Sequence, residues 1–174
     1  MTGRAESALV ALVPELDPVL DAHRRRLDTG AIRGVPAHVT VLYPWIPPAN
    51  ITNDVLTALG SVLREHPAFD LTFDAIRWFG DEVAYVRPNP DNAFRQLTAA
   101  IWQHWPDHPP YEGRIADPIP HLTIGDTGRS PELEAAAAEI EGSLPVRCRI
   151  ERLHLMAGTD EMGSWTVRTA IPLG

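Results

Sequence analysis

The sequence contains no lysine, a single cysteine and no long apolar run. All 15 basic residues of the 174-residue chain are arginine. Without lysine, the chain cannot form a Schiff base with a substrate, hold a nucleotide with a P-loop lysine, or carry an adenylated lysine as some ligases do. Enzyme classes that depend on any of these three uses of lysine are therefore excluded.

The lone cysteine, Cys148, restricts the sulfur chemistry that the chain can support. One cysteine cannot form an intrachain disulfide or a cysteine-rich zinc site, and this composition is typical of a reducing compartment. No segment reaches the roughly 20 apolar residues of a membrane span, and the N-terminus lacks the basic region and apolar stretch of a signal peptide. We therefore expect a soluble, cytoplasmic protein without a membrane partner.

The charge balance argues against a long nucleic-acid footprint. The 15 arginines are outnumbered by 23 acidic residues, which gives a formal net charge of -8 when the histidines are neutral. Binding to long nucleic acids depends mainly on neutralising phosphates with a basic surface. An acidic chain is better suited to a small nucleotide or to a single RNA end.

The order of predicted strands and helices indicates an α+β fold. The length of 174 residues fits one domain, residues 1–174, because domains commonly contain roughly 100 to 200 residues. Strands and helices mingle without a regular βαβ alternation, which favours largely antiparallel sheets. The predicted strands are 8–13, 35–44, 69–78, 83–87, 119–125, 146–156 and 164–171, and the predicted helices are 15–27, 53–66, 91–105 and 130–140.

Several polar residues are interpreted as structural. Arg24, Arg25 and Arg26 end the first predicted helix, where cations interact favourably with the helix dipole, so we expect all three to be exposed to solvent. His154 lies in a predicted strand and is expected to be a partly buried histidine with its hydrogen bonds satisfied. The spacing of two further histidines, at 104 and 108, is found in zinc sites, but a proline between them interrupts the helix, so no metal site is predicted.

Two histidine-threonine motifs are the most informative feature of the sequence. His38-Val-Thr40 and His121-Leu-Thr123 both come just after a proline and both lie in predicted strands. The histidines are 83 positions apart (121 − 38), close to half of the 174 residues, which indicates a duplicated architecture with approximate twofold symmetry. Because residues i and i+2 of a strand share a face, each histidine should lie on the same face as its threonine, with the intervening apolar residue on the core side.

Two imidazoles and two hydroxyls that converge on a small volume suit acid-base chemistry on a phosphate ester. An unperturbed imidazole has a pKa of about 6.5 and can accept or donate a proton near neutral pH. In the opening of a 2',3'-cyclic phosphate, one neutral histidine accepts a proton from the attacking water and the other, protonated, donates to the departing ribose oxygen. Thr40 and Thr123 would hydrogen-bond the nonbridging phosphate oxygens. Such a reaction requires no metal and no other cofactor.

These motifs resemble those of the 2H phosphoesterase superfamily, named for two His-x-Thr/Ser motifs, and in particular its 2'-5' RNA ligase-like or cyclic phosphodiesterase branch. The run from His38 to Trp45, followed by two prolines, is similar to the first motif of that branch and its loop. The resemblance implies a bilobal fold with a pseudo-twofold axis, in which two sheets with outer helices surround a central cleft. It also implies metal-independent activity on 2',3'-cyclic or 2'-5'-linked ribose phosphates, with His38 and His121 catalytic and Thr40 and Thr123 binding phosphate.

One position departs from the family pattern. Many relatives carry arginine five residues after the second histidine, where this chain has Asp126. A cation that would hold the phosphate is therefore missing at this position. Arg33 and Arg114 lie in predicted loops just before the two motifs, and either could supply the cation, although an exposed arginine without a role is the ordinary alternative.

Three aromatic residues are further candidates for substrate binding. Tyr43 follows the first motif and can line the site only if the strand bends before Pro44. Trp45 could stack on a base at the mouth of the cleft or anchor its loop in the core. Tyr85, in the strand that is predicted to pair with 69–78, could face either the cleft or the core.

The sequence therefore predicts a metal-independent phosphoesterase that hydrolyses 2',3'-cyclic phosphates of small nucleotides or RNA ends to a 2'-phosphate. Two alternatives remain open. Reversible 2'-5' ligation of RNA would need a basic track beside the cleft, whereas a binding module without turnover would be consistent with Asp126. We expect a monomer whose partner is a small nucleotide with a 2',3'-cyclic phosphate or an RNA terminus.

Overall fold

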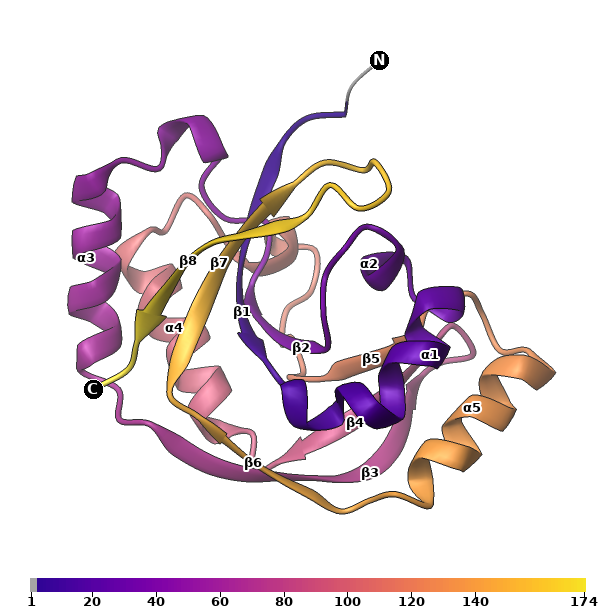
Figure 1. Ribbon diagram of the computed structural model, residues 1–174. Coiled ribbons are helices and arrows are strands. Elements are labelled where there is room, and N and C mark those ends of the chain that lie inside the picture. Colours follow the sequence, from indigo (N-terminus) through magenta and orange to yellow (C-terminus); the bar gives the residue numbers. More distant parts are fainter. Residues whose placement is uncertain (1–2) are drawn as a thin grey trace.

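The computed structural model describes residues 3–174 and contains two four-stranded antiparallel sheets with helices around them (Figure 1). The strands are β1 (Glu6–Leu12), β2 (His38–Leu42), β3 (Phe69–Phe79), β4 (Val83–Asn89), β5 (Leu122–Gly125), β6 (Val146–Ile150), β7 (Arg152–Gly158) and β8 (Thr166–Pro172). The helices are α1 (Asp17–Leu27), α2 (Thr29–Ile32), α3 (Asn53–Arg64), α4 (Asn92–His104) and α5 (Pro131–Glu141), and the 3₁₀ turns are η1 (Pro14–Leu16), η2 (Pro48–Asn50) and η3 (Pro110–Gly113). The predicted α+β fold with antiparallel sheets is confirmed.

Helices α3 and α5 begin at side-chain caps. The Thr52 hydroxyl accepts a hydrogen bond from the Val55 N–H at 3.3 Å, and the Ser130 hydroxyl accepts one from the Leu133 N–H at 3.2 Å. Such caps satisfy N–H groups that have no partner within the helix. They start these helices within one residue of the predicted positions.

The two motif strands occupy edge positions in their sheets. The strand orders are β2-β1-β7-β8 and β5-β4-β3-β6, so β2 and β5 are each hydrogen-bonded to one neighbour in their own sheet. Each motif strand ends a strand–helix–strand unit, β1–α1–β2 in one case and β4–α4–β5 in the other, and both strand pairs are antiparallel. Strands β2 and β5 also contact one another across the two sheets, near the centre of Figure 1. The fold therefore brings together two motifs that are far apart in the sequence.

Each motif strand has an apolar face that packs into the core and a polar face that points away from it. Val39 and Val41 of β2 are buried, whereas His38 and Thr40 are only partly buried. The second motif repeats this pattern, because Leu122 and Ile124 are buried and the histidine and threonine beside them are not. The predicted alternation is confirmed, although the second histidine lies directly before β5 rather than within it.

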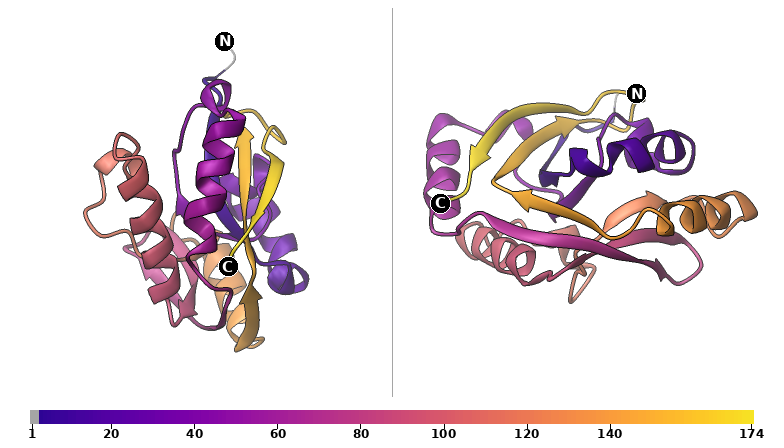
Figure 2. Two further views of the ribbon diagram at one scale, coloured as in Figure 1. Left: turned by 90° about the vertical axis from the view of Figure 1, so that its left-hand side faces the viewer. Right: turned by 60° about the horizontal axis from the view of Figure 1, so that its bottom comes forward.

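One hydrophobic core joins the two sheets. Phe73 of β3, Leu9 of β1 and Phe94 of α4 are fully buried within it, together with the inward residues of both motif strands. The right-hand view of Figure 2 shows the sheets as two layers with helices at their sides. Because the layers share a core, packing holds the two motifs in a fixed relation.

The predicted strand 146–156 is wrong, because the chain forms two strands there that belong to different sheets. Strand β6 pairs with β3, whereas β7 pairs with β1 and β8. The exposed Glu151 lies between β6 and β7. Both strands are extended, so the local pattern of apolar residues carries no information about a crossing from one sheet to the other. The predicted hairpin after this segment is confirmed as the pair β7 and β8.

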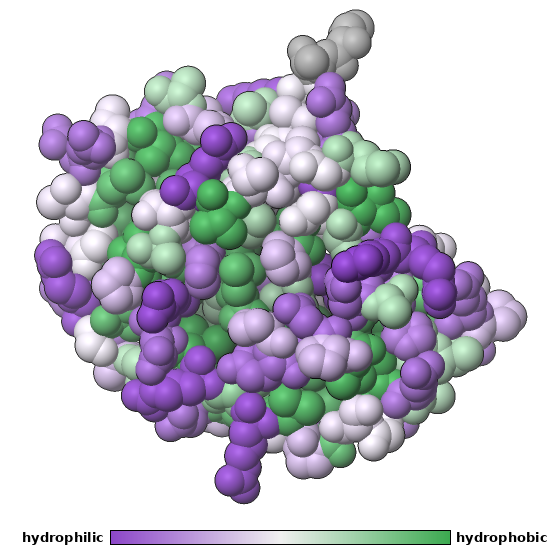
Figure 3. Space-filling model, in the orientation of Figure 1, coloured by the Kyte–Doolittle hydropathy of each residue, from purple (hydrophilic) through white to green (hydrophobic). Residues whose placement is uncertain are grey.

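The surface is mixed in polarity. Figure 3 shows apolar residues as small separate groups among polar ones on the face that it presents. Among residues 3–174, none of the helices combines the length and the apolar character that crossing a membrane requires.

Candidate functional site

The two motif histidines make the same local hydrogen bond. His38 Nδ1 lies 2.8 Å from the Pro36 carbonyl oxygen, and His121 Nδ1 lies 2.7 Å from the Ile119 carbonyl oxygen. A carbonyl oxygen only accepts, so each Nδ1 must carry the hydrogen. The neutral form of both imidazoles is thereby fixed as the tautomer with a free lone pair on Nε2. Each motif thus offers one Nε2 atom for proton transfer.

Both imidazoles are disposed toward the neutral form. Burial lowers the pKa of His38 to about 4, with help from the charge of Arg24 and a smaller contribution from His121, while the Pro36 carbonyl opposes the shift. Burial also lowers the pKa of His121, and the Ile119 carbonyl opposes it. The two histidines belong to the ends of β2 and β5, which contact one another. In the unliganded protein His38 is neutral at neutral pH and able to accept a proton.

A recess of about 160 Å³ lies beside the first motif. His38, Thr40, Tyr43 and Arg33 contribute its polar groups. Its apolar lining consists of Ala8, Val10, Val35, Met156 and Trp165. Two of the residues predicted to bind substrate, Tyr43 and Arg33, are therefore placed next to the first histidine.

Tyr43 reaches this recess because β2 ends one residue before it, at Leu42. Beyond the strand, its side chain no longer follows the alternation that would turn it away from His38. The Tyr43 hydroxyl donates a hydrogen bond to Glu6 at 2.6 Å, and its ring packs edge-on against Trp165 with 6.0 Å between centroids. The bend required by the sequence interpretation is thus present.

The second motif is supported by aromatic rings. His121 packs edge-on against Phe79 and Tyr85, with centroid distances of 4.9 Å and 5.6 Å, and these two rings stack on one another at 4.3 Å. Tyr85 of β4 pairs in register with Thr123 of β5. Tyr85 is 7% exposed, so its ring lies among neighbouring side chains that include His121 and Phe79, and not in solvent.

Tyr111, which the sequence interpretation missed, contacts the first motif from the long loop before β5. Its backbone N–H donates to the Tyr43 carbonyl at 2.6 Å. Burial raises the pKa of the Tyr111 phenol, and a side-chain hydrogen bond with Thr40 acts in the opposite direction. The residue has a φ of 51°, a left-handed conformation that costs a non-glycine residue about 1–3 kcal/mol. No pattern in this proline-rich loop indicates which strand it will contact.

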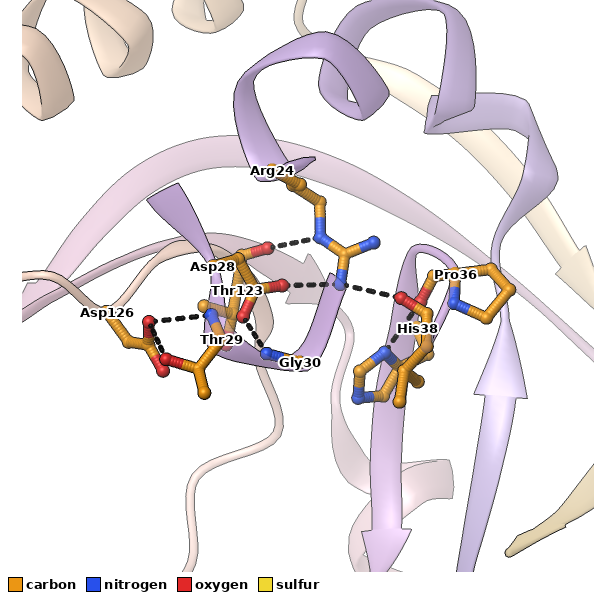
Figure 4. A network of polar contacts seen from close by, with 9 residues as sticks. Arg24, Asp28, Thr29, Gly30, Pro36, His38, Thr123 and Asp126 are labelled. Atoms are coloured by element: carbon orange, nitrogen blue, oxygen red, sulfur yellow. Dashed lines mark hydrogen bonds and ion pairs between the residues drawn. The ribbon is translucent and has the colours of Figure 1, made fainter. Parts of the chain in front are cut away.

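Arg24 is buried, which contradicts its interpretation as one of three solvent-exposed arginines. Only 2% of Arg24 is exposed, whereas Arg25 and Arg26 lie at the surface and pair with carboxylates. The helical position of Arg24 explains the difference, because it shares the inward face of α1 with Leu20 and Leu27. Figure 4 shows its guanidinium between the segments that carry the two motifs.

Asp126, at the position where many relatives carry arginine, binds the start of α2. One of its carboxylate oxygens accepts hydrogen bonds from the backbone N–H and the hydroxyl of Thr29, both at 2.9 Å (Figure 4). Negative charge at a helix N-terminus is favourable. Asp126 therefore links the end of the second motif strand to the segment that leads to Arg33.

We expect Asp126→Ala to lower the free energy of unfolding by about 1 kcal/mol, because the two hydrogen bonds from Thr29 to its carboxylate are lost. Urea denaturation of the wild type and the variant measures this difference. Asp126→Asn is the matched control, because its amide oxygen can still accept from Thr29 and should preserve most of the stability. Equal stability of the wild type and Asp126→Ala would contradict this role.

Two residues predicted to bind substrate do not line the recess. Trp45 is 3% exposed and packs edge-on against Trp105 in the core at 5.2 Å, so of its two suggested roles it is not placed to stack on a base. The alternative of a loop anchor describes it correctly. Arg114 is 79% exposed and forms an ion pair with Glu112 at 2.6 Å. Of the two candidate cations, the structure places only Arg33 at the recess.

Outside the motifs, the prediction that His154 has its hydrogen bonds satisfied is wrong. Its Nδ1 atom is buried without a hydrogen-bond partner among residues 3–174. Among the same residues, no three histidine, cysteine, aspartate or glutamate side chains gather closely enough to hold a metal ion.

Comparisons with known proteins give a family and a shared fold. The family model of the 2'-5' RNA ligase superfamily matches residues 12–161. LigT from E. coli in complex with 3'-AMP has a similar structure, with a TM-score of 0.60, 15% sequence identity and 98% of both chains covered. TT0787 from Thermus thermophilus has a TM-score of 0.62 and 18% identity, with 98% of this chain and 97% of that chain covered. No protein with curated annotation matches the sequence.

The family match and the shared fold confirm the resemblance that the two motifs predicted. The match includes both motifs and the strands that carry them. The solved structures share the arrangement of sheets and helices over nearly the whole chain. The chain belongs to the 2'-5' RNA ligase superfamily of 2H phosphoesterases.

Proposed function

We propose that this protein hydrolyses 2',3'-cyclic phosphates of small nucleotides or RNA ends, and that His38 and His121 act as the general base and general acid. The observation that carries the proposal is the matched orientation of the two imidazoles. Each is held through Nδ1 by a carbonyl two residues upstream, which leaves both Nε2 atoms available for proton transfer. Membership of a superfamily of phosphoesterases and RNA ligases supports an enzyme of this kind.

The proposed reaction is one displacement at phosphorus. His38 Nε2 accepts a proton from water as the water oxygen bonds to phosphorus, and the bond from phosphorus to the ribose 3' oxygen breaks. His121 donates its Nε2 proton to that oxygen on the opposite side of phosphorus. The product is a 2'-phosphate with a free 3'-hydroxyl, and proton exchange with solvent restores both histidines.

The assignment of roles follows from the electrostatic difference between the histidines. Burial and, after it, the charge of Arg24 lower the pKa of His38 to about 4, so His38 is the neutral base. The shift of His121 has no comparable contribution from a cation. An anionic substrate near His121 raises its pKa and favours the protonated form that a general acid requires.

Binding of the substrate is assigned to the polar face of the two motifs and the recess beside them. Thr40 and Thr123 donate hydrogen bonds to nonbridging phosphate oxygens, where negative charge resides in the transition state. Arg33 supplies the cation that Asp126 does not. The apolar wall formed by Trp165 and its neighbours accepts the nucleoside portion. Crystal structures of LigT with 3'-AMP, ATP and NADP+ support a small nucleotide as ligand.

The pH dependence of kcat/KM is expected to be bell-shaped with its maximum on the acidic side of neutrality. His38 must be deprotonated, so the rate rises with pH through its pKa of about 4. His121 must be protonated, so the rate falls as pH rises through a pKa that burial holds below its usual value. Initial rates in buffers of constant ionic strength measure the profile. A rate that increases steadily through neutral and alkaline pH would contradict these roles.

A panel of substrates followed by phosphorus NMR tests the proposal. It contains 2',3'-cyclic mononucleotides, ADP-ribose 1'',2''-cyclic phosphate and 2'-5'-linked oligonucleotides. Conversion of a cyclic phosphate into one monoester supports hydrolysis. Formation of a 2'-5' linkage from a cyclic phosphate end and a 5'-hydroxyl end would instead identify a ligase. Saturable shifts of the substrate signal without any product would identify a binding module.

A further inference from the structure

The buried Arg24 lies between the two motifs and makes hydrogen bonds to both of the segments that carry them (Figure 4). We propose that Arg24 is a positioning residue, whose guanidinium sets the spacing between the second motif strand and the segment that leads into the first motif. This inference rests on the proposed function, because it assigns a purpose to the spacing of the two histidines.

The contacts of Arg24 are specific to its guanidinium. Its Nε donates to the carbonyl of Thr123 at 3.1 Å, within the second motif. Its Nη2 donates to the carbonyl of Val35 at 3.3 Å, three residues before His38, and to Asp28 at 2.5 Å. One side chain from α1 therefore joins strand β5 of one sheet to the entry of strand β2 of the other.

Helix α4 also contacts the motif strand of the opposite sheet, but through an uncharged side chain. Helix α4 packs against β2, as α1 packs against β5, so each helix contacts the motif strand of the opposite sheet. From α4, the Thr98 hydroxyl donates to the Val41 carbonyl at 2.7 Å. Both helices thus hydrogen-bond a carbonyl of the opposite motif strand. Of these two contacts, the one made by Arg24 carries a positive charge, and the one made by Thr98 does not. The charge distinguishes the surroundings of the two histidines.

The charge of Arg24 acts on His38. After burial, this charge is the largest influence that lowers the pKa of His38. The pKa of His121 is lowered by burial, and the hydrogen bond to the Ile119 carbonyl opposes that shift. The other charged or titratable groups around the first motif come from separate elements. They are Glu6 of β1, which binds Tyr43, Asp28 before α2, which binds Arg24, and also Arg33 after α2, Tyr43 after β2, Tyr111 of η3 and His121 before β5. Removing the Arg24 charge should therefore raise the pKa of His38.

Asp28 allows the guanidinium to be buried. Asp28 is 3% exposed, and its carboxylate accepts from Arg24 and from the Gly30 N–H, the latter at 2.9 Å. A guanidinium is a planar group with five donors and can reach several acceptors at once, whereas an ammonium is a single point of charge. Arg24→Lys therefore keeps the charge but cannot keep all three contacts. This variant separates the effect of Arg24 on the spacing of the two motifs from the effect of its charge on the pKa of His38.

The experiment compares Arg24→Lys, Arg24→Met and a matched control, Arg25→Met. Arg25 is the next residue of α1 and also pairs with an aspartate four positions away, but on the exposed side of the helix. For a 2',3'-cyclic nucleotide, we expect Arg24→Lys to lower kcat by up to about 100-fold with little change in KM, because misplaced catalytic groups have effects of that size. Arg24→Met should lower kcat by a similar factor. The low-pH limb of its profile of kcat/KM against pH should also move to higher pH. Arg25→Met should match the wild type.

Two further measurements separate this inference from folding defects and from the proposed function. Arg24→Met leaves Asp28 buried without its cation, so Arg24→Met/Asp28→Leu is prepared as well, and circular dichroism checks that each variant folds. Titration of the His38 imidazole by NMR reports its pKa without turnover. A higher His38 pKa in the methionine variants, with no hydrolysis even by the wild type, would reject the proposed function but retain the influence of Arg24. Folded variants with wild-type kcat and an unchanged His38 pKa would overturn the inference.

Discussion

His121→Ala is expected to lower kcat for a 2',3'-cyclic nucleotide by about 10²- to 10⁴-fold, the usual contribution of a positioned general acid or base. Without His121, the ribose oxygen must depart as an alkoxide. His38→Ala should have a loss of the same order, because the attacking water then keeps its proton. Initial rates at the pH optimum of the wild type, with circular dichroism to verify folding, measure both effects.

The nature of the leaving group distinguishes the two histidines. A phosphodiester with a nitrophenyl leaving group needs little protonation as it departs. On such a substrate, the loss caused by His121→Ala should become small, whereas the loss caused by His38→Ala should persist. His154→Ala serves as a control, because His154 is a strand histidine outside both motifs. Equal losses on both substrates for both variants would contradict the assignment of acid and base.

Thr40→Val and Thr123→Val are each expected to lower kcat by about 10²-fold, close to the effect of removing one hydrogen-bond donor from an oxyanion site. Valine has nearly the shape of threonine but lacks the hydroxyl that would bind a nonbridging phosphate oxygen. Because the charge on these oxygens matters most in the transition state, kcat should fall more than substrate affinity. Steady-state kinetics with a 2',3'-cyclic nucleotide separate the two quantities.

Conservative variants test whether these hydroxyls act on the substrate. Thr40→Ser and Thr123→Ser keep the hydroxyl and should retain most of the activity. Thr166→Val changes an exposed strand threonine in β8, outside the motifs, and should have no effect. If both motif valine variants kept the kcat of the wild type, the proposed role of the threonines in binding phosphate would be wrong.

The features that could be predicted from the sequence are those that depend on local geometry. The alternation of a strand predicted that Val39 and Leu122 would be buried while the motif histidines and threonines would share the other face, and the structure confirms it. The repeated motif predicted a duplicated arrangement, and both motif strands indeed lie at the edge of a four-stranded sheet. These predictions required no knowledge of which strands pair.

The features that could not be predicted depend on contacts between distant segments. The helical spacing of Arg24 from Leu20 and Leu27 indicates an inward face, but the carbonyls that accept from its guanidinium belong to distant segments that the spacing does not reveal. Tyr111 reaches Thr40 from a loop whose course is decided by tertiary packing. In the same way, Trp45 packs on an indole 60 positions later in the chain (105 − 45), which no local pattern reveals.

The central claim is that the two motifs form one phosphoesterase site that works without a metal ion. The most direct test is a phosphorus NMR time course of a nucleoside 2',3'-cyclic phosphate with protein that has been dialysed against EDTA. We predict that the wild type converts the cyclic phosphate signal into that of a 2'-phosphate, and that His38→Ala and His121→Ala produce no detectable monoester over the same period. Conversion by either variant at the rate of the wild type, or a wild type that becomes inactive in EDTA and recovers with added metal, would contradict the claim.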